Sequence, residues 1–128
     1  MGIKKEIRND PVRITGTKYR PIDNRADIIN YLHKTIDTIN SLADPFSKAL
    51  IAVLMISYIQ PFEDGNKRTV RILGNAILLA NNVCPLSYRS VKEADYKSAT
   101  ILFYEQNNAV FFKELFMEQF EFAVDNYF

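Results

Sequence analysis

Two strongly apolar segments separated by a short polar turn are the feature that most constrains how this chain can fold. The first, residues 45–59, follows Asp44-Pro45, which is typical of a helix start because aspartate caps free N–H groups and proline suits the first helical position. Since it is apolar on almost every side, we expect a buried central helix that ends before Pro61. Turn chemistry at residues 63–66 then predicts a second apolar helix over about residues 67–81.

The N-terminal part predicts a small β-hairpin followed by an amphipathic helix. Residues 12–14 and 18–19 flank Thr15-Gly16-Thr17, a glycine-containing turn, and proline at position 21 ends the pattern. Apolar residues at helical spacing then predict a helix that begins after Asp23.

Two more helices are predicted in the C-terminal part. A capping-box pattern over residues 90–93 predicts a helix to about residue 105, and Asn107-Asn108 introduces a last helix with phenylalanines at every fourth position. No linker or repeat divides the chain of 128 residues. We therefore expect a single domain over residues 1–128, mainly α with one small hairpin.

Composition excludes several classes of function. A formal net charge of +1 argues against a nucleic-acid-coating protein. Cys84 is the only cysteine, so no disulfide can form within the chain. With only one cysteine and one histidine, a zinc site is implausible. The longest apolar run is too short to span a bilayer, and no apolar leader begins the chain, so a cytoplasmic protein without membrane partners is expected. The abrupt start is what a fragment of a longer protein would show.

Cations stand where the second apolar helix begins. Lys67, Arg68 and Arg71 occupy its first turn or so, where the helix dipole disfavours each cation by roughly 0.3–1 kcal/mol. Free N–H groups, a glycine turn and these cations together make an anion site, although a solvated cationic face is the plain alternative. Arg68 and Arg71 share a helix face, and Asp64 could hold a divalent cation between two phosphates. The pattern predicts a polyphosphate with Mg²⁺.

The stretch Gln-Pro-Phe-Glu-Asp-Gly-Asn-Lys-Arg-Thr-Val-Arg, residues 60–71, resembles the signature of the Fic (Fido) family. That signature reads His-Pro-Phe-x-(Asp/Glu)-Gly-Asn-(Gly/Lys)-Arg-x-x-Arg, and only Gln60 departs from it. The apolar helices on both sides agree with the family, and residues 12–21 resemble its flap. The resemblance implies a helical Fic-type fold.

Family enzymes typically transfer AMP from ATP to a Ser, Thr or Tyr hydroxyl of a target protein. The resemblance implies that Asp64 binds Mg²⁺ and that the turn and following helix bind the nucleotide phosphates. The implied nucleotide-binding residues are Gly65, Asn66, Lys67, Arg68 and Arg71. The implied target-binding flap residues are Ile14, Thr15, Gly16 and Thr17, which would hold a peptide by strand addition.

Gln60 stands where the family has its catalytic histidine. Imidazole suits a general base because its pKa of about 6.5 lies near working pH. A glutamine amide can orient the attacking hydroxyl but cannot take its proton, so about 10²–10⁴-fold of the rate should be lost. His33 is read as a structural residue and Glu63 as a solvated rim acid, each with relocated-base chemistry as its alternative.

Two functional readings follow, and both include a nucleotide ligand. The first is a weak or inactive enzyme, with AMP as the transferred group or, because Lys67 also occurs in family members that transfer phosphate, a phosphotransferase. The second is a non-catalytic nucleotide- or peptide-binding module. By resemblance, further partners are a target protein with an acceptor hydroxyl and an inhibitory helix or antitoxin-like protein, with self-association open. No nucleic-acid partner is expected. Tyr96 and Tyr104 are read as core-edge residues, with an adenine pocket as their alternative.

Overall fold

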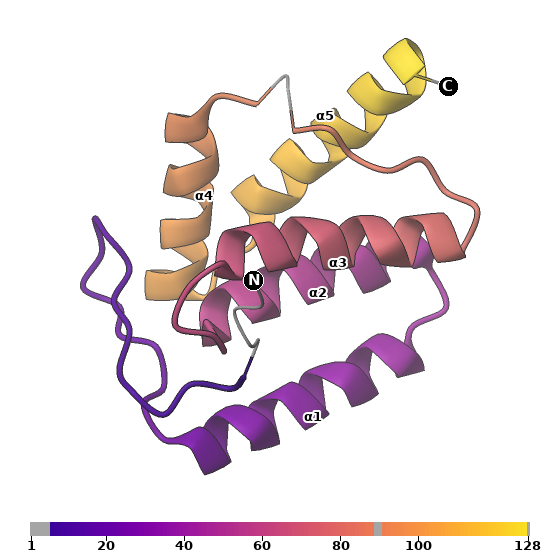
Figure 1. Ribbon diagram of the computed structural model, residues 1–128. Coiled ribbons are helices and arrows are strands. Elements are labelled where there is room, and N and C mark those ends of the chain that lie inside the picture. The colour runs from indigo at the N-terminus through magenta and orange to yellow at the C-terminus, as the bar shows by residue number, and fades with distance from the viewer. Residues whose placement is uncertain (1–5, 89–90, 128) are drawn as a thin grey trace, which may run out of the picture.

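The computed structural model describes residues 6–88 and 91–127 and is built from helices (Figure 1). Within this described part, the secondary structure is helical and contains no strand. The helices are α1 Arg25–Ser41, α2 Pro45–Ile59, α3 Asn66–Ala80, α4 Glu93–Gln106 and α5 Val110–Tyr127. The prediction of a mainly α fold is therefore confirmed.

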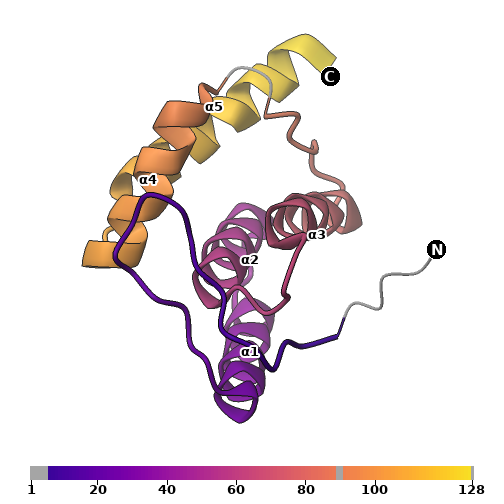
Figure 2. The same ribbon diagram turned by 60° about the vertical axis from the view of Figure 1, so that its left-hand side comes forward.

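Helices α2 and α3 form the centre of the molecule and lie side by side (Figures 1 and 2). Asp44 caps α2 through its carboxylate, which accepts the N–H groups of Phe46 and Ser47. The central helix is buried on several sides, as its apolar composition predicts. Its contact with α3 is close at Gly74, where an added Cβ would lie 2.8 Å from Cγ2 of Val53.

Gly74→Ala is expected to destabilise the fold by about 1 kcal/mol. Crowding against Val53 costs about 1–3 kcal/mol, which exceeds the roughly 1 kcal/mol that alanine gains over glycine inside a helix. Urea denaturation measures the difference. In a Val53→Ala background the same substitution should become neutral or stabilising, and a stabilised Gly74→Ala single variant would contradict the close approach.

The other helices cover the central pair from two sides. Helix α1 packs on α2, whereas α4 and α5 pack against each other and α4 also contacts α2. Figure 2 shows α1 apart from the layer that α4 and α5 form. The predicted phenylalanine stripe of α5 faces this core, with Phe116 edge-on to Phe46 at 5.0 Å between ring centroids. None of the described helices combines the length and apolar composition needed to cross a bilayer.

The predicted β-hairpin is not formed. Residues 12–20 run as an extended segment with a turn at Thr15-Gly16, and no ladder of backbone hydrogen bonds joins its two arms in the described chain. Side chains hold the segment instead: the Thr17 hydroxyl donates to Glu105, and the Tyr19 hydroxyl donates to the carbonyl of Tyr58 at 2.7 Å. We call residues 12–20 the flap; it lies beside α4 in both ribbon views (Figures 1 and 2).

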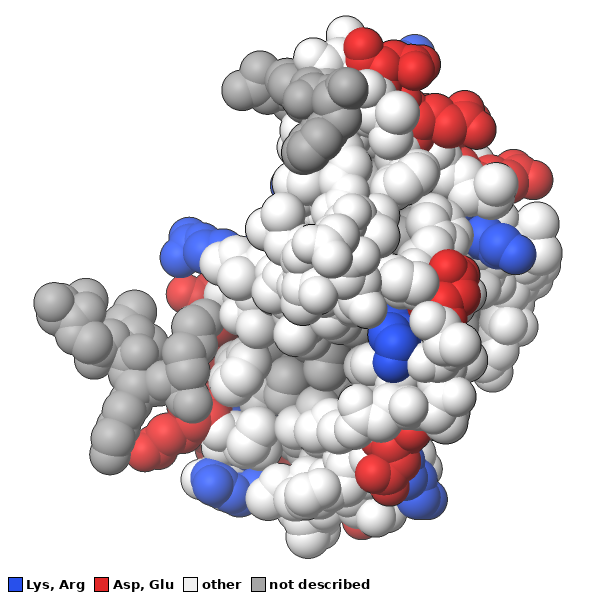
Figure 3. Space-filling model, turned by 90° about the vertical axis from the view of Figure 1, so that its right-hand side faces the viewer, with Lys and Arg blue, Asp and Glu red and all other residues white. Residues whose placement is uncertain are grey.

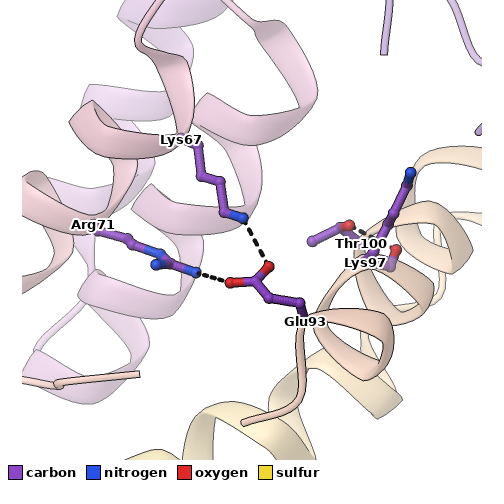
Figure 4. Close-up of polar contacts among 5 residues, drawn as sticks. All are labelled: Lys67, Arg71, Glu93, Lys97 and Thr100. Carbon is purple, nitrogen blue, oxygen red and sulfur yellow. Dashed lines mark hydrogen bonds and ion pairs between the residues drawn. The ribbon is translucent and has the colours of Figure 1, made fainter. Parts of the chain in front are cut away.

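Helix α4 begins later than the capping-box pattern predicts. Its N-cap is Lys92, with no side-chain cap hydrogen bond, and Ser90 lies outside the described residues. Glu93 is the first helical residue, and its carboxylate points toward α3 rather than back along its own helix (Figure 4). The capping-box interpretation of Glu93 was therefore wrong.

Charge is mixed on the face shown in Figure 3. Lys and Arg side chains there are scattered among Asp and Glu across a largely uncharged surface. This agrees with a formal net charge of +1 and gives no continuous field of one sign on that face.

Candidate functional site

Arg8 fixes the place where α2 ends and the signature turn begins. Its side chain is buried, with 2% exposed, and it donates to backbone carbonyls of four residues: Gln60 (2.6 Å), Asp10 (3.1 Å), Ile59 (3.2 Å) and Ile22. Its own N–H donates to the carbonyl of Pro61 at 3.0 Å. The last carbonyls of a helix have no N–H partner within the helix, and at the end of α2 the guanidinium of Arg8 donates to them instead. Burial lowers the pKa of the guanidinium, and the charge of Asp23 opposes that effect.

Asn66 holds the signature turn in shape. Its buried side-chain amide accepts the N–H of Phe62 at 3.0 Å and donates to the carbonyl of Phe62 at 2.7 Å. Gly65 precedes it in the left-handed region, at φ 77°, which glycine adopts without strain. The side chain of Asn66 is thus engaged within the loop, which leaves its backbone N–H as the group that can face an anion.

The N-terminus of α3 opens into a cavity lined by cations. No side chain of the described residues caps this end of the helix, so the first N–H groups, of Asn66, Lys67 and Arg68, are left without an intrahelical partner and can face a ligand. The cavity has a volume of about 650 Å³, and we call it the cationic cavity. Its lining residues are Gln60, Glu63, Asp64, Gly65, Asn66, Lys67, Arg68, Arg71 and Ile72. The structure therefore brings together, around one cavity, the residues of the predicted turn and those predicted to bind phosphate.

Asp64 lies on the exposed rim of the cationic cavity. One carboxylate oxygen accepts the N–H of Gly65 at 2.8 Å, which fixes the side chain beside the cations. Mg²⁺ is usually held by one or two carboxylates together with substrate phosphates and waters. A single rim carboxylate next to a cavity lined by cations fits that pattern. Within the described residues no cluster of three or more His, Cys, Asp or Glu side chains makes a self-contained metal site.

Glu93 supplies an internal anion to two of the cations that line the cationic cavity (Figure 4). From the start of α4 its carboxylate reaches Lys67 at 2.8 Å and Arg71 at 3.6 Å. The hydrogen bond from Lys67 is the largest cause of a lowered Glu93 pKa, and the charges of both cations add to it. A depressed folded-state pKa means that the ion pairs stabilise the fold at neutral pH. That contribution is lost as pH falls through the folded-state pKa.

The guanidinium of Arg71 lies between two aromatic rings, and some of its N–H donors make no hydrogen bond within the described residues. Its guanidinium carbon lies 4.6 Å from the ring centroid of Tyr88 and 5.2 Å from that of Tyr96. Its Nε and one Nη are buried and make no hydrogen bond within the described residues, since the contact with Glu93 is too long to be one. Buried guanidinium donors normally have acceptors, so this arrangement suits an anionic ligand.

A second cavity, of about 430 Å³, lies between the flap, α2 and α4. We call it the aromatic cavity. Its lining residues are Arg13, Ile14, Ser57, Gln60, Lys67, Glu93, Ala94, Tyr96, Lys97, Thr100, Ile101 and Tyr104. Burial raises the pKa of Tyr104 to about 12 and also raises that of Tyr96, so both phenols are neutral donors at physiological pH. Both tyrosines therefore reach a cavity, which the core-edge interpretation alone did not predict.

Gln60 and Lys67 line both cavities, and Gln60 marks the boundary between them. Gln60 caps α2 in the left-handed conformation, at φ 51° and ψ 62°. Its side-chain Nε2 donates to the carbonyl of Ser57 at 2.7 Å, which fixes which end of the amide is the donor. The amide oxygen is then the end suited to accept a hydroxyl hydrogen bond.

Of the four predicted flap residues, one lines the aromatic cavity, and none lines the cationic one. Ile14 lines the aromatic cavity, and Thr15-Gly16 forms the turn of the flap. A Cβ added at Gly16 would lie 3.1 Å from Nζ of Lys97, so the flap turn rests close to α4. Tyr19 anchors the returning arm, with its ring 4.5 Å from Tyr58 and 5.3 Å from Tyr104 between centroids.

Three further titratable residues differ in where they lie. His33 is exposed on α1 and lines neither cavity, whereas Glu63 is exposed on the rim of the cationic cavity. Cys84 is buried, and burial raises the pKa of its thiol. The sequence reasoning missed Arg8 and the site role of Glu93. In the sequence Glu93 stands at a helix start, where the capping-box pattern accounted for it, and Arg8 resembles any surface cation.

The chain belongs to the Fic/DOC family, whose model matches residues 2–78. A probable protein adenylyltransferase of Aquifex aeolicus (strain VF5) is 33% identical over 96 residues, which is 69% of this chain and 28% of the relative. The protein adenylyltransferase fic-1 of Caenorhabditis briggsae is 31% identical over 75 residues, 59% of this chain and 14% of the relative. The chain thus spans less than a third of the length of these two relatives.

A solved structure has a similar fold. The crystal structure of BepC, a VirB-translocated effector protein of Bartonella tribocorum with bound AMPPNP, superposes with a TM-score of 0.71 at 19% identity. The match covers 88% of this chain and 56% of that one. At this identity the likeness supports the helical fold, and the family is established by residues 2–78.

Proposed function

We propose that this chain binds Mg·ATP in the cationic cavity and slowly transfers AMP to a hydroxyl of a target protein. The observation that carries the proposal is the guanidinium of Arg71, whose buried Nε and one Nη make no hydrogen bond within the described residues. Lys67, Arg68 and the first N–H groups of α3 lie around the same cavity and add further donors. A polyphosphate supplies several strong acceptors to such a set. The relatives named as protein adenylyltransferases support AMP as the transferred group.

The residues of this chain would divide the work between the two cavities. In the cationic cavity Lys67, Arg68 and the N–H groups of α3 would bind the phosphates, and Asp64 would hold Mg²⁺. Bound Mg²⁺ would supply charge neutralisation of the phosphate oxygens. In the aromatic cavity the flap would position the target hydroxyl next to Gln60. Family resemblance alone supports this last placement.

The transfer itself would leave one step unassisted. The target oxygen forms a bond to the α-phosphorus, the bond to the β-phosphate oxygen breaks, and pyrophosphate leaves. The hydroxyl proton must then pass to solvent, because the Gln60 amide can accept a hydrogen bond but has no basic site. This makes a slow enzyme, and Gln60 equally favours the second candidate, a module that binds nucleotide without chemistry.

Arg68→Ala is the direct test of nucleotide binding. Isothermal titration with Mg·ATP should show binding to the parent that is weakened about 10- to 100-fold in the variant, because a charge-assisted phosphate contact is worth about 1.5–3 kcal/mol. Lys34→Ala, which removes an exposed cation from α1, is the control and should leave the affinity unchanged. Equal binding by Arg68→Ala and the parent would refute the assignment.

Glu93→Gln is expected to strengthen Mg·ATP binding about two- to fivefold. The carboxylate competes with phosphate for Lys67 and Arg71, and an exposed pair of this kind is worth about 0.2–1 kcal/mol. Titration calorimetry at low salt measures the change. Glu118→Gln removes the same charge from α5 and serves as control. Weaker binding in Glu93→Gln would show that the carboxylate supports the site instead of competing with its ligand.

A further inference from the structure

The flap carries positive charge without compensation. Over residues 11–22 the chain has three cations and no acid, and these cations are Arg13, Lys18 and Arg20. All three are exposed. Surfaces of folded domains ordinarily intersperse both signs, since clustered like charges repel one another. The positive charge of the flap is therefore a local excess, because the chain as a whole has a net charge of only +1.

These cations have no acidic partner in the described part of the chain. The guanidinium of Arg13 donates only to the carbonyl of its neighbour Val12, at 3.0 Å, and no ion pair joins it, Lys18 or Arg20 to a carboxylate there. Two acids that border the flap or its cavity are engaged elsewhere. Glu105 accepts the hydroxyl of Thr17, and Glu93 is paired with Lys67 and Arg71.

A fourth cation extends this charge into the aromatic cavity. Lys97 of α4 lines that cavity together with Arg13, and its Nζ lies beside the flap turn at Gly16. Figure 4 shows Lys97 on α4 apart from the Lys67–Glu93 pair. A ligand that lies along the flap and enters the cavity would therefore meet cations at its entrance.

The backbone of the flap favours a peptide as that ligand. Apart from the turn at Thr15-Gly16, residues 13–20 run as open chain and make no backbone-to-backbone hydrogen bond within the described residues. Side chains of Thr17 and Tyr19 hold the segment in place, and the Thr17 hydroxyl oxygen also accepts the N–H of Tyr19 at 3.1 Å, so the other backbone groups are the ones left for a ligand. An extended segment with available N–H and C=O groups can pair with an added peptide strand. A nucleic acid offers no matching ladder of N–H and C=O groups, so its phosphates alone would have to account for binding.

We infer that the flap recognises an acidic segment of the target protein, with carboxylates on both sides of the acceptor hydroxyl. The inference rests on the proposed function, because it assigns the target of that same site. Backbone pairing gives the peptide its direction, whereas Arg13, Lys18, Arg20 and Lys97 select for acidic side chains. Acidic flanks increase the affinity of the segment, and basic flanks reduce it.

Two nine-residue fluorescent peptides test the inference. Both carry a central tyrosine, one with glutamates at alternating flanking positions and its twin with glutamines there. Fluorescence anisotropy with the full chain at low salt should show the acidic peptide binding about three- to tenfold more tightly. The difference should shrink at about 0.5 M salt, where screening is stronger.

The matched variants are Arg13→Gln/Lys18→Gln, on the two sides of the flap turn, and Lys34→Gln/Lys113→Gln, which removes two exposed cations from α1 and α5. The flap variant should lose the preference for the acidic peptide, and the control variant should keep it. Equal affinity of the parent for both peptides overturns the inference, as does tighter, flap-dependent binding of a single-stranded oligonucleotide of equal charge. Mg·ATP titration separates the two proposals: nucleotide binding without peptide preference refutes this one alone.

Discussion

Gln60→His is expected to raise the rate of AMP transfer by about 10²–10⁴-fold, which is the contribution that a general base makes. Gln60 lies at the junction of the two cavities, where an imidazole could meet both the target hydroxyl and the phosphate. Its backbone is in the left-handed region, at φ 51°, which histidine tolerates better than most residues. The gain in rate is measured with ATP that carries a label on its α-phosphate, by following the incorporation of the label into protein or peptide acceptors.

Gln60→Ala is the matched control, because it removes the amide without adding a base and should stay at or below the parent rate. ATP labelled at the γ-phosphate, used in parallel, distinguishes phosphate transfer from AMP transfer and so tests the alternative that Lys67 suggests. Robust transfer by the parent, at the rate of the histidine variant, would refute the argument that the chain lacks a base.

Arg8→Met is expected to destabilise the fold by at least about 3 kcal/mol. The substitution keeps an unbranched side chain but removes the donors for four backbone carbonyls, which are buried or partly buried. A buried carbonyl left unpaired costs about 1–3 kcal/mol. Stabilities of small domains lie near 5–15 kcal/mol, so this loss is a large share. Urea denaturation followed by circular dichroism measures it.

Arg25→Met provides the comparison. Arg25 is exposed and makes one hydrogen bond to a backbone carbonyl, that of Ile7 at 2.8 Å, so its loss should cost less than about 1 kcal/mol. Arg8→Lys should fall between the two, because lysine keeps the charge but cannot reach carbonyls in several directions at once. Equal destabilisation by Arg8→Met and Arg25→Met would contradict the role of the buried guanidinium.

Much of the fold could be predicted because local signals and packing agree. Asp44-Pro45 marks the start of α2, and the apolar composition of that helix predicts its burial. Glycine at position 65 and the cations after it predicted a turn and an anion-binding helix start, and the structure gathers them around one cavity. These features depend on neighbours in the sequence, which a single chain displays directly.

The features that escaped prediction depend on residues distant in the sequence. Arg8 reaches carbonyls of residues 59 and 60, more than fifty positions away, and nothing near it in the sequence indicates burial. Glu93 pairs with Lys67, 26 positions away, although its local context suggested a helix cap. The predicted hairpin failed for the same reason, since Thr17 and Tyr19 find partners on α4 and α2.

The two cavities share lining residues, so we expect the affinity for a ligand in one cavity to depend on whether the other is occupied. Lys67 borders both cavities and holds Glu93, which also borders the aromatic one. A nucleotide that draws Lys67 away releases a carboxylate next to the peptide site. Whatever factor the nucleotide then imposes on peptide affinity, the peptide must impose on nucleotide affinity. A carboxylate released beside the flap repels an acidic peptide, so the coupling should be negative.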